Sequence, residues 1–372
     1  MGSYRTGAWF FFISKILGAA VRVFLVCLTL QILIFAPLGI PFLLNAIVTM
    51  LVVWLYTFRG GVKTVIWTDL FKTMCLVLSV VLCIYFIALQ LGYSLGGVCQ
   101  AIFGSDMSQV FFFDDVNDRR FFPKQFFAGV FTIIATTGLD QDLMQRNLSC
   151  RNSDESRKNM IVSIFMQFIV ISLFLMLGAL LYIFAAHVGP ELSQCNGDEL
   201  FTKVATGGYL PVVVGILFLI GLVAAAFGAA GSALTALTTS FTVDILNADC
   251  TDEQATARIR RRVHAGMALL MAVVIYVFNL LNNTSVIDAV YILASYTYGP
   301  ILGMFAFGIL TPWHVRDRYI PCVAILAPVL CFILDRNSVA WFNGYRFSYE
   351  LLILNALFTF IGLCMLVKRQ RA

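Results

Sequence analysis

Residues 222–245 read LVAAAFGAAGSALTALTTSFTVDI, and the rest of the chain is interpreted outward from them. They predict a membrane helix with small residues in its first half and hydroxyls in its second. At steps of three and four, one face of that helix carries a stripe made of Ala225, Gly228, Ser232, Thr235, Thr239 and Thr242. Oxygen atoms at that depth can replace part of the water shell of an alkali cation. The alternative is helix packing, with each hydroxyl bonded to the carbonyl four residues before it.

The composition excludes a soluble globular protein. Of the 372 residues, 60% are hydrophobic and 12% are charged, and the mean hydropathy is +0.89. Many apolar runs are long enough to cross a bilayer. The sequence therefore predicts an all-α polytopic membrane protein, one transmembrane domain over residues 1–372, with the lipid bilayer as its partner. About ten spans are expected: 7–35, 42–58, 64–91, 124–145, 159–187, 209–245, 263–281, 287–311, 319–334 and 349–367.

The positions of Lys and Arg predict the orientation of the chain. With the N-terminus inside the cell, 16 of the 25 positive residues fall in cytoplasmic segments and six in outer loops. Positive residues favour the cytoplasmic side, so both termini are expected there, which requires an even number of spans. The predicted location is the plasma (inner) membrane. The net charge of +5 reflects this topology, and the sequence indicates neither a nucleic acid nor an obligate protein partner.

Cysteine and histidine residues predict no metal site. The ten Cys are scattered without a CxxC pair or zinc spacing, and the three His are dispersed. A disulfide between Cys99 and Cys195, in two outer loops, is left open. The sequence has no nucleophile–base spacing and no phosphate-binding loop. The chain is therefore not expected to be an enzyme, and no cofactor is predicted.

Three ionisable residues attract attention within the expected spans. Lys15 and Arg22 are seven residues apart and share one face of the first span, and Asp69 lies about two turns inside the third. A charge at membrane depth costs about 3 kcal/mol, so such groups face water or a partner. Pairing with an acidic residue or snorkelling is the default for Lys15 and Arg22. For Asp69 the alternative is solvation at the inner surface.

The fourth expected span has an unusual end. Its apolar part stops at Ala135, and a polar run with Thr136, Thr137 and Gln141 follows. A short apolar segment that ends in small and polar residues is typical of a discontinuous transport helix, so these three residues are candidates for a substrate cavity. The alternative is a helix that leaves the membrane early. The preceding outer segment, about residues 92–123, is expected to lie partly on the membrane surface or to cap the entrance.

Three segments taken together resemble the sodium/solute symporter family: GGVKTVIWTDLFK (60–72), DQDLMQRN (140–147) and GSALTALTTSFTVDI (231–245). The resemblance covers nearly the whole chain and implies the leucine-transporter-type fold, an inverted repeat of five plus five helices. The first span, with SKILGAAVRVFLV (14–26), is similar to the third core helix of that family, so the first two core helices are expected to be missing. Accordingly, residues 7–91 would finish the first repeat, 124–311 would form the second, and 319–367 would supply two accessory helices.

The resemblance also implies an ion site that has lost part of its ligands. The primary sodium site of the family uses a carbonyl that matches Ala225 and two hydroxyls whose positions hold Gly228 and Ala229 here. A second sodium site of some members matches Asp69, Gly231 and Ser232. A hard cation needs several oxygen ligands. The family resemblance therefore implies sodium coupling, whereas the residues at these positions argue against it.

These observations predict a secondary active transporter that moves a small solute, ancestrally with sodium. Thr136 and Thr137 fall where sugar-carrying members have an aromatic gate, which disfavours a stacked sugar. The identity of the solute stays open. The alternative is a non-transporting scaffold or sensor relative, or an inactive fragment. Gly228 and Ala229 favour that alternative, and the lack of a signalling domain after Arg371 opposes it.

Overall fold

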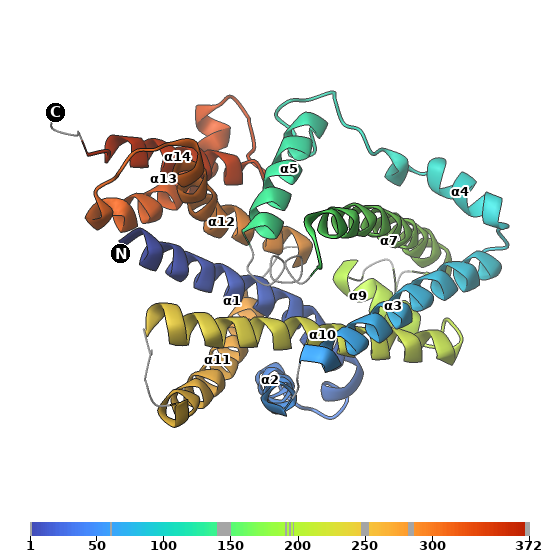
Figure 1. Ribbon diagram of the computed structural model, residues 1–372. Coiled ribbons are helices and arrows are strands. Elements are labelled where there is room, and N and C mark those ends of the chain that lie inside the picture. The colour runs from blue at the N-terminus through green and yellow to red at the C-terminus, as the bar shows by residue number, and fades with distance from the viewer. Residues whose placement is uncertain are drawn as a thin grey trace.

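The chain is helical in the part that the structure describes. This computed structural model describes residues 2–59, 62–139, 150–189, 192, 195, 197–246, 253–281 and 286–368, and β pairing among them is limited to an isolated bridge. The elements (Figure 1) are α1 (Gly2–Leu30), η1 (Gln31–Phe35), α2 (Phe42–Arg59), α3 (Val62–Gln90), α4 (Leu95–Phe103), η2 (Asp106–Ser108), α5 (Phe122–Gly138), α7 (Ser153–Val188), α9 (Gly197–Thr206), α10 (Val212–Ser240), η3 (Phe241–Ile245), α11 (Glu253–Leu281), α12 (Val286–Leu310), η4 (Asp317–Tyr319), α13 (Ile320–Trp341) and α14 (Leu351–Met365).

Each of the ten expected spans has a helix, so the predicted fold class is confirmed. Among the described residues, seven helices are long and apolar enough to cross a membrane, and Phe42–Thr57 and Leu351–Met365 are apolar but shorter. The tenth helix, α5, has 17 residues and covers the first part of the fourth expected span, 124–145. Residues 140–149, which include Gln141, lie outside the described residues. The division into repeats and the absence of two core helices stay predictions.

Several helices extend beyond the expected spans because hydropathy follows the membrane and not the helix; α11, for example, begins at Glu253 and not at residue 263. The helix expected from residue 159 begins at Ser153, where the Asn152 side chain accepts a hydrogen bond from the Glu155 backbone N–H at 2.8 Å. Such a cap, with acidic residues in the first turn, stabilises the positive end of a helix. The helix expected to end at residue 334 continues to Trp341. Polar turns at the two helix ends therefore extend beyond the apolar runs.

Two spans end in π-helical turns. α1 continues into η1 and α10 into η3, and in η1 the Ala36 backbone N–H donates to the Gln31 carbonyl at 2.7 Å. The wider turn changes the i→i−4 pattern, and the Cys27 carbonyl accepts a hydrogen bond from the buried Asn45 amide at 2.7 Å. The same amide group donates to Gln31 Oε1 at 3.1 Å. Asn45 thus fixes α2 against the irregular end of α1.

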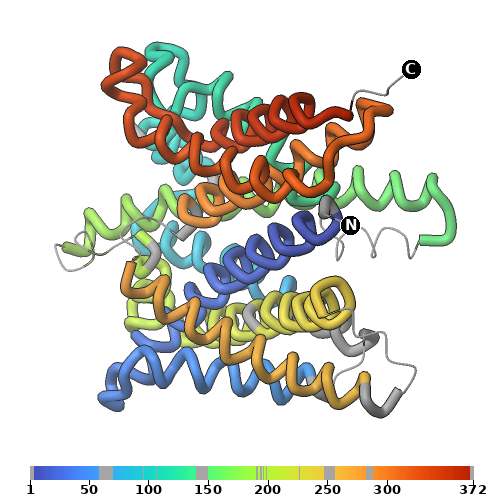
Figure 2. The backbone as a smooth tube through the Cα atoms, turned by 90° about the vertical axis from the view of Figure 1, so that its left-hand side faces the viewer, coloured from blue at the N-terminus to red at the C-terminus, as the bar shows by residue number. Residues whose placement is uncertain are grey.

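α1 lies between two groups of helices (Figures 1 and 2), with α12 to α14 on one side and α2, α10 and α11 on the other. Fully buried side chains such as Met50, Leu234 and Met271 form one core with α1. Glycine allows α10 to approach its neighbours closely. A Cβ at Gly231 would lie 2.9 Å from Thr57 Cγ2 on α2, and one at Gly221 would lie 2.7 Å from a carbon of α3. This part of α10 is therefore a packing surface.

The segment before α5 is fixed to the loop before α14 by one lysine. The side chain of Lys124 is 5% exposed, and its Nζ donates to the carbonyls of Asp118 at 3.1 Å and Arg346 at 3.0 Å. The same nitrogen lies 3.8 Å from Glu350 Oε1 and 3.9 Å from the centre of the Tyr345 ring. We call these five residues the Lys124 clamp. It joins residues that are far apart in the sequence.

Asp118 belongs to the clamp through its backbone carbonyl, and its side chain also interacts with Arg120. Its carboxylate accepts a hydrogen bond from the Arg120 backbone N–H at 3.0 Å and pairs with the guanidinium at 3.1 Å. These hydrogen bonds hold the pKa of the Asp118 carboxyl below its ordinary value of 3.8. Whether the surrounding segment lies on the membrane surface or caps an entrance stays a prediction.

The disulfide left open between Cys99 and Cys195 is not formed. Both residues are free thiols, and Cys99 is exposed. The Cys195 sulfur instead accepts a hydrogen bond from Lys203 Nζ at 3.3 Å. Cys195 thus serves as a partner of α9.

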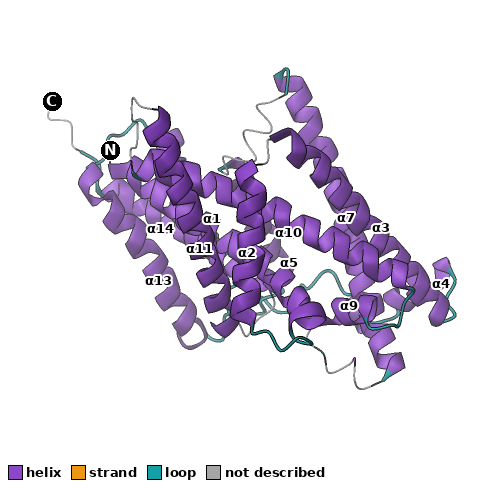
Figure 3. Cartoon of the chain, turned by 90° about the horizontal axis from the view of Figure 1, so that it is seen from below, coloured by secondary structure: helices purple, strands orange, loops and turns teal. Residues whose placement is uncertain are grey.

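The N-terminal end of α1 and the C-terminal end of α14 lie at the same end of the bundle in all three views (Figures 1 to 3). Ends on the same side agree with an even number of crossings. Their predicted cytoplasmic location stays a prediction.

Candidate functional site

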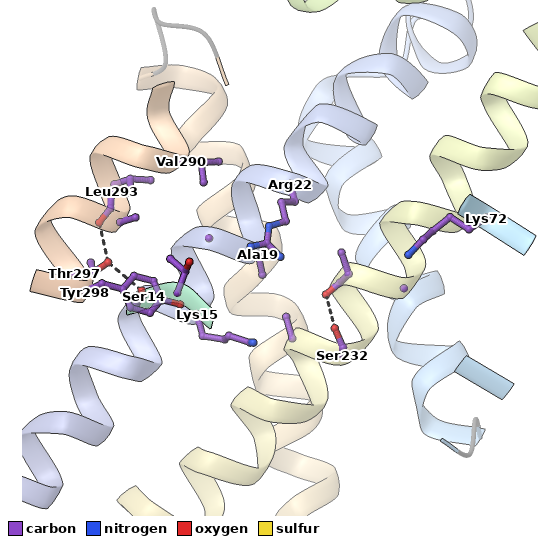
Figure 4. A pocket seen from close by; sticks show the side chains of 16 residues that line it. Ser14, Lys15, Ala19, Arg22, Lys72, Ser232, Val290, Leu293, Thr297 and Tyr298 are labelled. Carbon is purple, nitrogen blue, oxygen red and sulfur yellow. Dashed lines mark hydrogen bonds between the residues drawn. The ribbon is translucent and has the colours of Figure 1, made fainter. Parts of the chain in front are cut away.

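Five helices that are distant in sequence surround one cavity of about 330 Å³ (Figure 4). It lies against α1 and is closed by α3, α5, α10 and α12. The lining residues are Ser14, Lys15, Gly18, Ala19, Arg22, Lys72, Thr136, Gly228, Ala229, Ser232, Ala233, Val290, Leu293, Ala294, Thr297 and Tyr298. A cavity of this size and mixed chemistry is typical of a small-molecule site.

Small residues form the wall of the cavity that α10 supplies. Gly228, Ala229 and Ser232 line the cavity, but Ala225 is not among the lining residues. The Ser232 hydroxyl donates to the Ala229 carbonyl at 3.2 Å. Gly228 and Ala229 thus bring no side-chain oxygen to the cavity wall, and Ser232 brings one that is already engaged as a donor.

Further along α10 the packing interpretation of the stripe holds. The hydroxyls of Thr235, Thr239 and Thr242 donate to the carbonyls four residues earlier, at 2.9, 3.0 and 2.7 Å. Such bonds satisfy a hydroxyl within its own helix. The stripe therefore divides into a cavity-lining part and a part whose hydroxyls are satisfied locally.

Three cationic side chains line the cavity: Lys15 and Arg22 from α1, and Lys72 from α3. Figure 4 shows the amino ends of Lys15 and Lys72 turned toward α10. Lys15 and Lys72 have other interactions within the protein. Arg22 is exposed, and in the described part of the chain it forms neither an ion pair nor a hydrogen bond. The default expected for Arg22, pairing with an acidic residue or snorkelling, stays a prediction: no acidic partner is found among the described residues, and an exposed side chain is compatible with snorkelling.

The hydroxyls that α12 and α5 bring to the cavity are already hydrogen-bonded within the protein. Thr297 of α12 donates to the Ser14 hydroxyl of α1 at 3.0 Å, and it also lies 2.8 Å from the Leu293 carbonyl. Thr136 of α5 donates to the Thr132 carbonyl at 2.8 Å. The bond between Thr297 and Ser14 links α1 to α12 at the level of the cavity. The hydroxyl oxygens remain able to accept a hydrogen bond from a bound molecule.

The structure brings some of the predicted residues together and separates others. Thr136, Gly228, Ala229 and Ser232 share the cavity, whereas Thr137 and Ala225 are not among its lining residues. The side chain of Asp69 and all of Gln141 lie outside the described residues. As ion or substrate ligands, all of these residues stay predictions.

Sequence reasoning missed Lys72, Thr297 and Tyr298 as lining residues. Lys72 stands in the quoted segment 60–72, three residues after Asp69, and that spacing could have placed it on the same helix face. Thr297 and Tyr298 stand in an uncharged stretch of α12 that carries no comparable signal.

Sequence reasoning also missed a partly buried polar bridge between three helices. The ring nitrogens of His264 lie 2.9 Å from the hydroxyls of Thr57 and Thr238, which joins α2, α10 and α11. The bridge belongs to the packing of these helices, since none of the three residues lines the cavity.

The family model described as SSF, the sodium:solute symporter family, matches residues 10–314. The chain is 26% identical over 310 residues to the sodium/sialic acid symporter NanT of Aliivibrio fischeri, covering 79% of this chain and 58% of that protein. It is 24% identical over 315 residues to the sodium-dependent multivitamin transporter of Oryctolagus cuniculus, covering 81% and 49%. The chain thus spans about half the length of the curated relatives that it matches.

Among solved structures, the fold is similar to that of a Na⁺-coupled sialic acid symporter in a substrate-bound outward-open state. The TM-score is 0.73 at 17% sequence identity, and the match covers 98% of this chain and 75% of that one. At this identity the likeness supports the fold alone.

Proposed function

The chain belongs to the sodium:solute symporter family, and from this premise we propose that it is a secondary active transporter whose small solute binds in the cavity between α1, α3, α5, α10 and α12. The match confirms the resemblance that residues 60–72, 140–147 and 231–245 indicated. The named relatives are transporters, in agreement with the expectation that the chain is not an enzyme.

The observation that carries the proposal is the cavity itself. Helices from the predicted first repeat (α1, α3) and from the predicted second repeat (α5, α10, α12) meet at this cavity, and its lining includes cationic side chains and hydroxyls. In transporters built from inverted repeats, the solute site lies near the middle of the bilayer between the repeats. α1 and α12 are linked at this level by the bond between Ser14 and Thr297. A relative shift of the repeats would therefore change the cavity.

We propose that sodium coupling, which belongs to the ancestral function, is weak in this chain. The named relatives are sodium-coupled. At the cavity, however, Gly228 and Ala229 offer a hydrogen and a methyl group where the family resemblance implies hydroxyls. Two lost oxygens of about six remove a large part of the shell that must replace the ion's water.

The chain is a multi-pass membrane protein. We place it in the plasma membrane with both termini in the cytoplasm, because most Lys and Arg residues then face inward. Reporter fusions at Thr6 and after Ala372 should both be active only inside the cell. An external signal from either fusion would contradict this orientation.

A non-transporting relative is the second candidate, and the same two residues favour it. Such a protein would bind a solute at the cavity without moving it. The two candidates differ in one observable, because only the transporter accumulates solute behind a sealed membrane.

The test is uptake into proteoliposomes that contain the 372-residue chain. We expect saturable uptake of one solute class from a labelled panel of neutral sugars, amino acids and carboxylates. Uptake should fall by less than half when the sodium gradient is collapsed, because the ion site is incomplete. Binding of a panel member without any uptake would support the non-transporting candidate and overturn the transporter.

A further inference from the structure

A groove of about 250 Å³ lies between α2 and α11, which run side by side along one edge of the bundle (Figures 1 and 2). Its lining consists of Ile47, Met50, Leu51, Trp54, Ala265, Ala268, Leu269 and Ala272. These side chains are apolar except for the indole nitrogen of Trp54, and none of them lines the cavity described above. The groove is therefore separate from the proposed solute site.

The shape of the groove comes from a difference in side-chain size. Its floor includes Met50 and Ala272, which are 1% and 2% exposed, whereas Leu51 and Leu269 on its rims are 50% and 62% exposed. Alanines on α11 keep the space between the rims open. In a membrane, the walls of an empty apolar groove lose van der Waals contacts, so an acyl chain or another helix is expected to fill it.

Four exposed arginines precede the groove on α11: Arg258, Arg260, Arg261 and Arg262. Three of them stand three, four and seven residues before the groove-lining Ala265, so they share its face of the helix. Arg260 stands five residues before Ala265 and lies on the opposite face. Arg258 and Arg261 also have other interactions within the protein. Positive charge thus continues the line of the groove along α11.

The depth of these arginines fits the headgroups of a bilayer. Residues 263–281, which complete α11 after Arg262, contain no Asp, Glu, Lys or Arg. Nineteen helical residues span about 28 Å, close to the hydrocarbon thickness of about 30 Å. If they fill the hydrocarbon core, Arg262 lies at its boundary, where phospholipid phosphates are. The groove begins three residues further in and runs inward, in the direction of an acyl chain.

The end of the groove nearest the arginines has a fixed geometry. The Thr57 hydroxyl of α2 lies 2.9 Å from Nε2 of His264, which directly precedes Ala265 on α11. This contact holds the two helices together where the charged and apolar parts meet. A lipid would therefore find the two parts of its site already in place.

We propose that this groove seats an acyl chain of an anionic phospholipid, whose phosphate binds the arginines on the same face of α11. Guanidinium donors match the oxygens of a phosphate, and each positive residue near the membrane surface favours an anionic headgroup by roughly five-fold. A second copy of the chain fits less well, because a two-fold axis along the membrane normal would bring the same arginines together at one depth. The proposal does not rest on transport, because lipid binding is measured without it.

Trp54 supplies the test, because bromine atoms on an acyl chain quench the fluorescence of a tryptophan that they contact. The chain is placed in phosphatidylcholine bilayers with a small, fixed fraction of brominated phosphatidylglycerol or, in a matched sample, of brominated phosphatidylcholine. The difference in quenching between the parent chain and Trp54→Phe isolates the contribution of Trp54. Trp313→Phe gives the reference in the same way, since Trp313 is exposed and lies three residues before Arg316 but does not line the groove.

We expect the preference for brominated phosphatidylglycerol at Trp54 to exceed that at Trp313 by roughly five-fold. Arg262→Gln should lower the preference at Trp54 by roughly five-fold, and Arg260→Gln, on the opposite face, by less than about two-fold. Ala265→Leu, which fills the groove at an exposed alanine, should reduce quenching of Trp54 by both lipids. Equal preferences at the two tryptophans, or equal effects of the two arginine substitutions, would overturn the proposal.

Thermal unfolding of the parent chain in neutral micelles gives a second measurement that needs no variant. Short-chain phosphatidylglycerol should raise the melting temperature more than phosphatidylcholine with the same chains, and glycerol phosphate should not raise it. An equal rise with glycerol phosphate would show an anion site without a seat for an acyl chain. Formation of a dimer that abolishes lipid quenching of Trp54 would show that a second copy fills the groove. Either result would overturn the proposal.

Discussion

Lys124 and Arg22 are both cations within expected membrane helices, and their surroundings are opposite. Lys124 is buried among two carbonyls, the Glu350 carboxylate and the Tyr345 ring. Arg22 faces a cavity and has no such partner among the described residues. A buried charge is tolerated when its surroundings satisfy it, as at Lys124. Arg22 is left unpaired at a cavity, so the two cations are expected to respond in opposite ways to substitution.

The largest expected effect on stability follows from the removal of the Lys124 charge. Lys124→Gln should lower the free energy of unfolding by about 3 kcal/mol, because it leaves the Glu350 carboxylate, 14% exposed, without its cation. Thermal unfolding of the purified chain measures this change. Lys203→Gln is the matched control, since its pair with Glu199 is more exposed, and it should cost about 0.4 kcal/mol. Equal losses in the two variants would show that the clamp does not depend on burial.

Arg22 should behave in the opposite way. Arg22→Gln removes a charge that has no partner among the described residues, so the free energy of unfolding without ligand should change by no more than about 0.5 kcal/mol. Thermal unfolding of the purified chain measures this change. A large loss of stability without ligand would place Arg22 with Lys124 as a structural cation.

A smaller effect is expected at Asp118, whose ion pair is at the surface beside the clamp. Its folded pKa is lowered by hydrogen bonds from Arg120, so the stabilisation is present above the unfolded value of about 3.8 and is lost as the pH falls through the folded value. Asp118→Asn should therefore lower the melting temperature slightly at neutral pH. The difference from the parent chain should vanish in acid. A difference that grows toward acid pH would show that folding raises the pKa of Asp118 and does not lower it.

The smallest effect is expected from restoring two hydroxyls. Gly228→Ser with Ala229→Ser should leave the melting temperature equally insensitive to sodium and potassium at equal ionic strength. Two hydroxyls form only part of a shell of about six oxygens, and three cationic side chains line the same cavity. A rise specific to sodium, increasing with its concentration, would show that an ion site persists and that the cations do not dominate the cavity.

The sequence predicted the helices well and the cavity only in part. Apolar length alone located the ten helices. The stripe singled out Gly228 and Ser232, and the family resemblance singled out Ala229; all three line the cavity. Helical spacing cannot show which hydroxyls a helix satisfies by itself, so Thr235 and Thr239 were included although both bond their own helix.

The wall supplied by α12 could not be predicted, because the closeness of Thr297 and Ser14 arises from packing between distant segments. Likewise, spacing placed Lys15 and Arg22 on one face but could not tell a paired cation from an unpaired one. The difference between Lys124 and Arg22 has the same origin. Apart from the Asp118 carbonyl, the partners of Lys124 (Tyr345, Arg346 and Glu350) lie more than two hundred residues away in the chain.

The most direct test of the cavity as the solute site is uptake by proteoliposomes that contain the Ser232→Cys chain. The solute is the one that the parent chain takes up from the labelled panel, and uptake is measured before and after complete reaction of the introduced thiol with a methanethiosulfonate that carries a sulfonate group. A bulky group on the thiol would occupy the cavity, so uptake should be lost and should return when a reducing agent removes the group. The parent chain, modified at Cys99, should keep its uptake. Uptake that continues at the full rate after modification in the cavity would contradict the assignment of this cavity as the path of the solute.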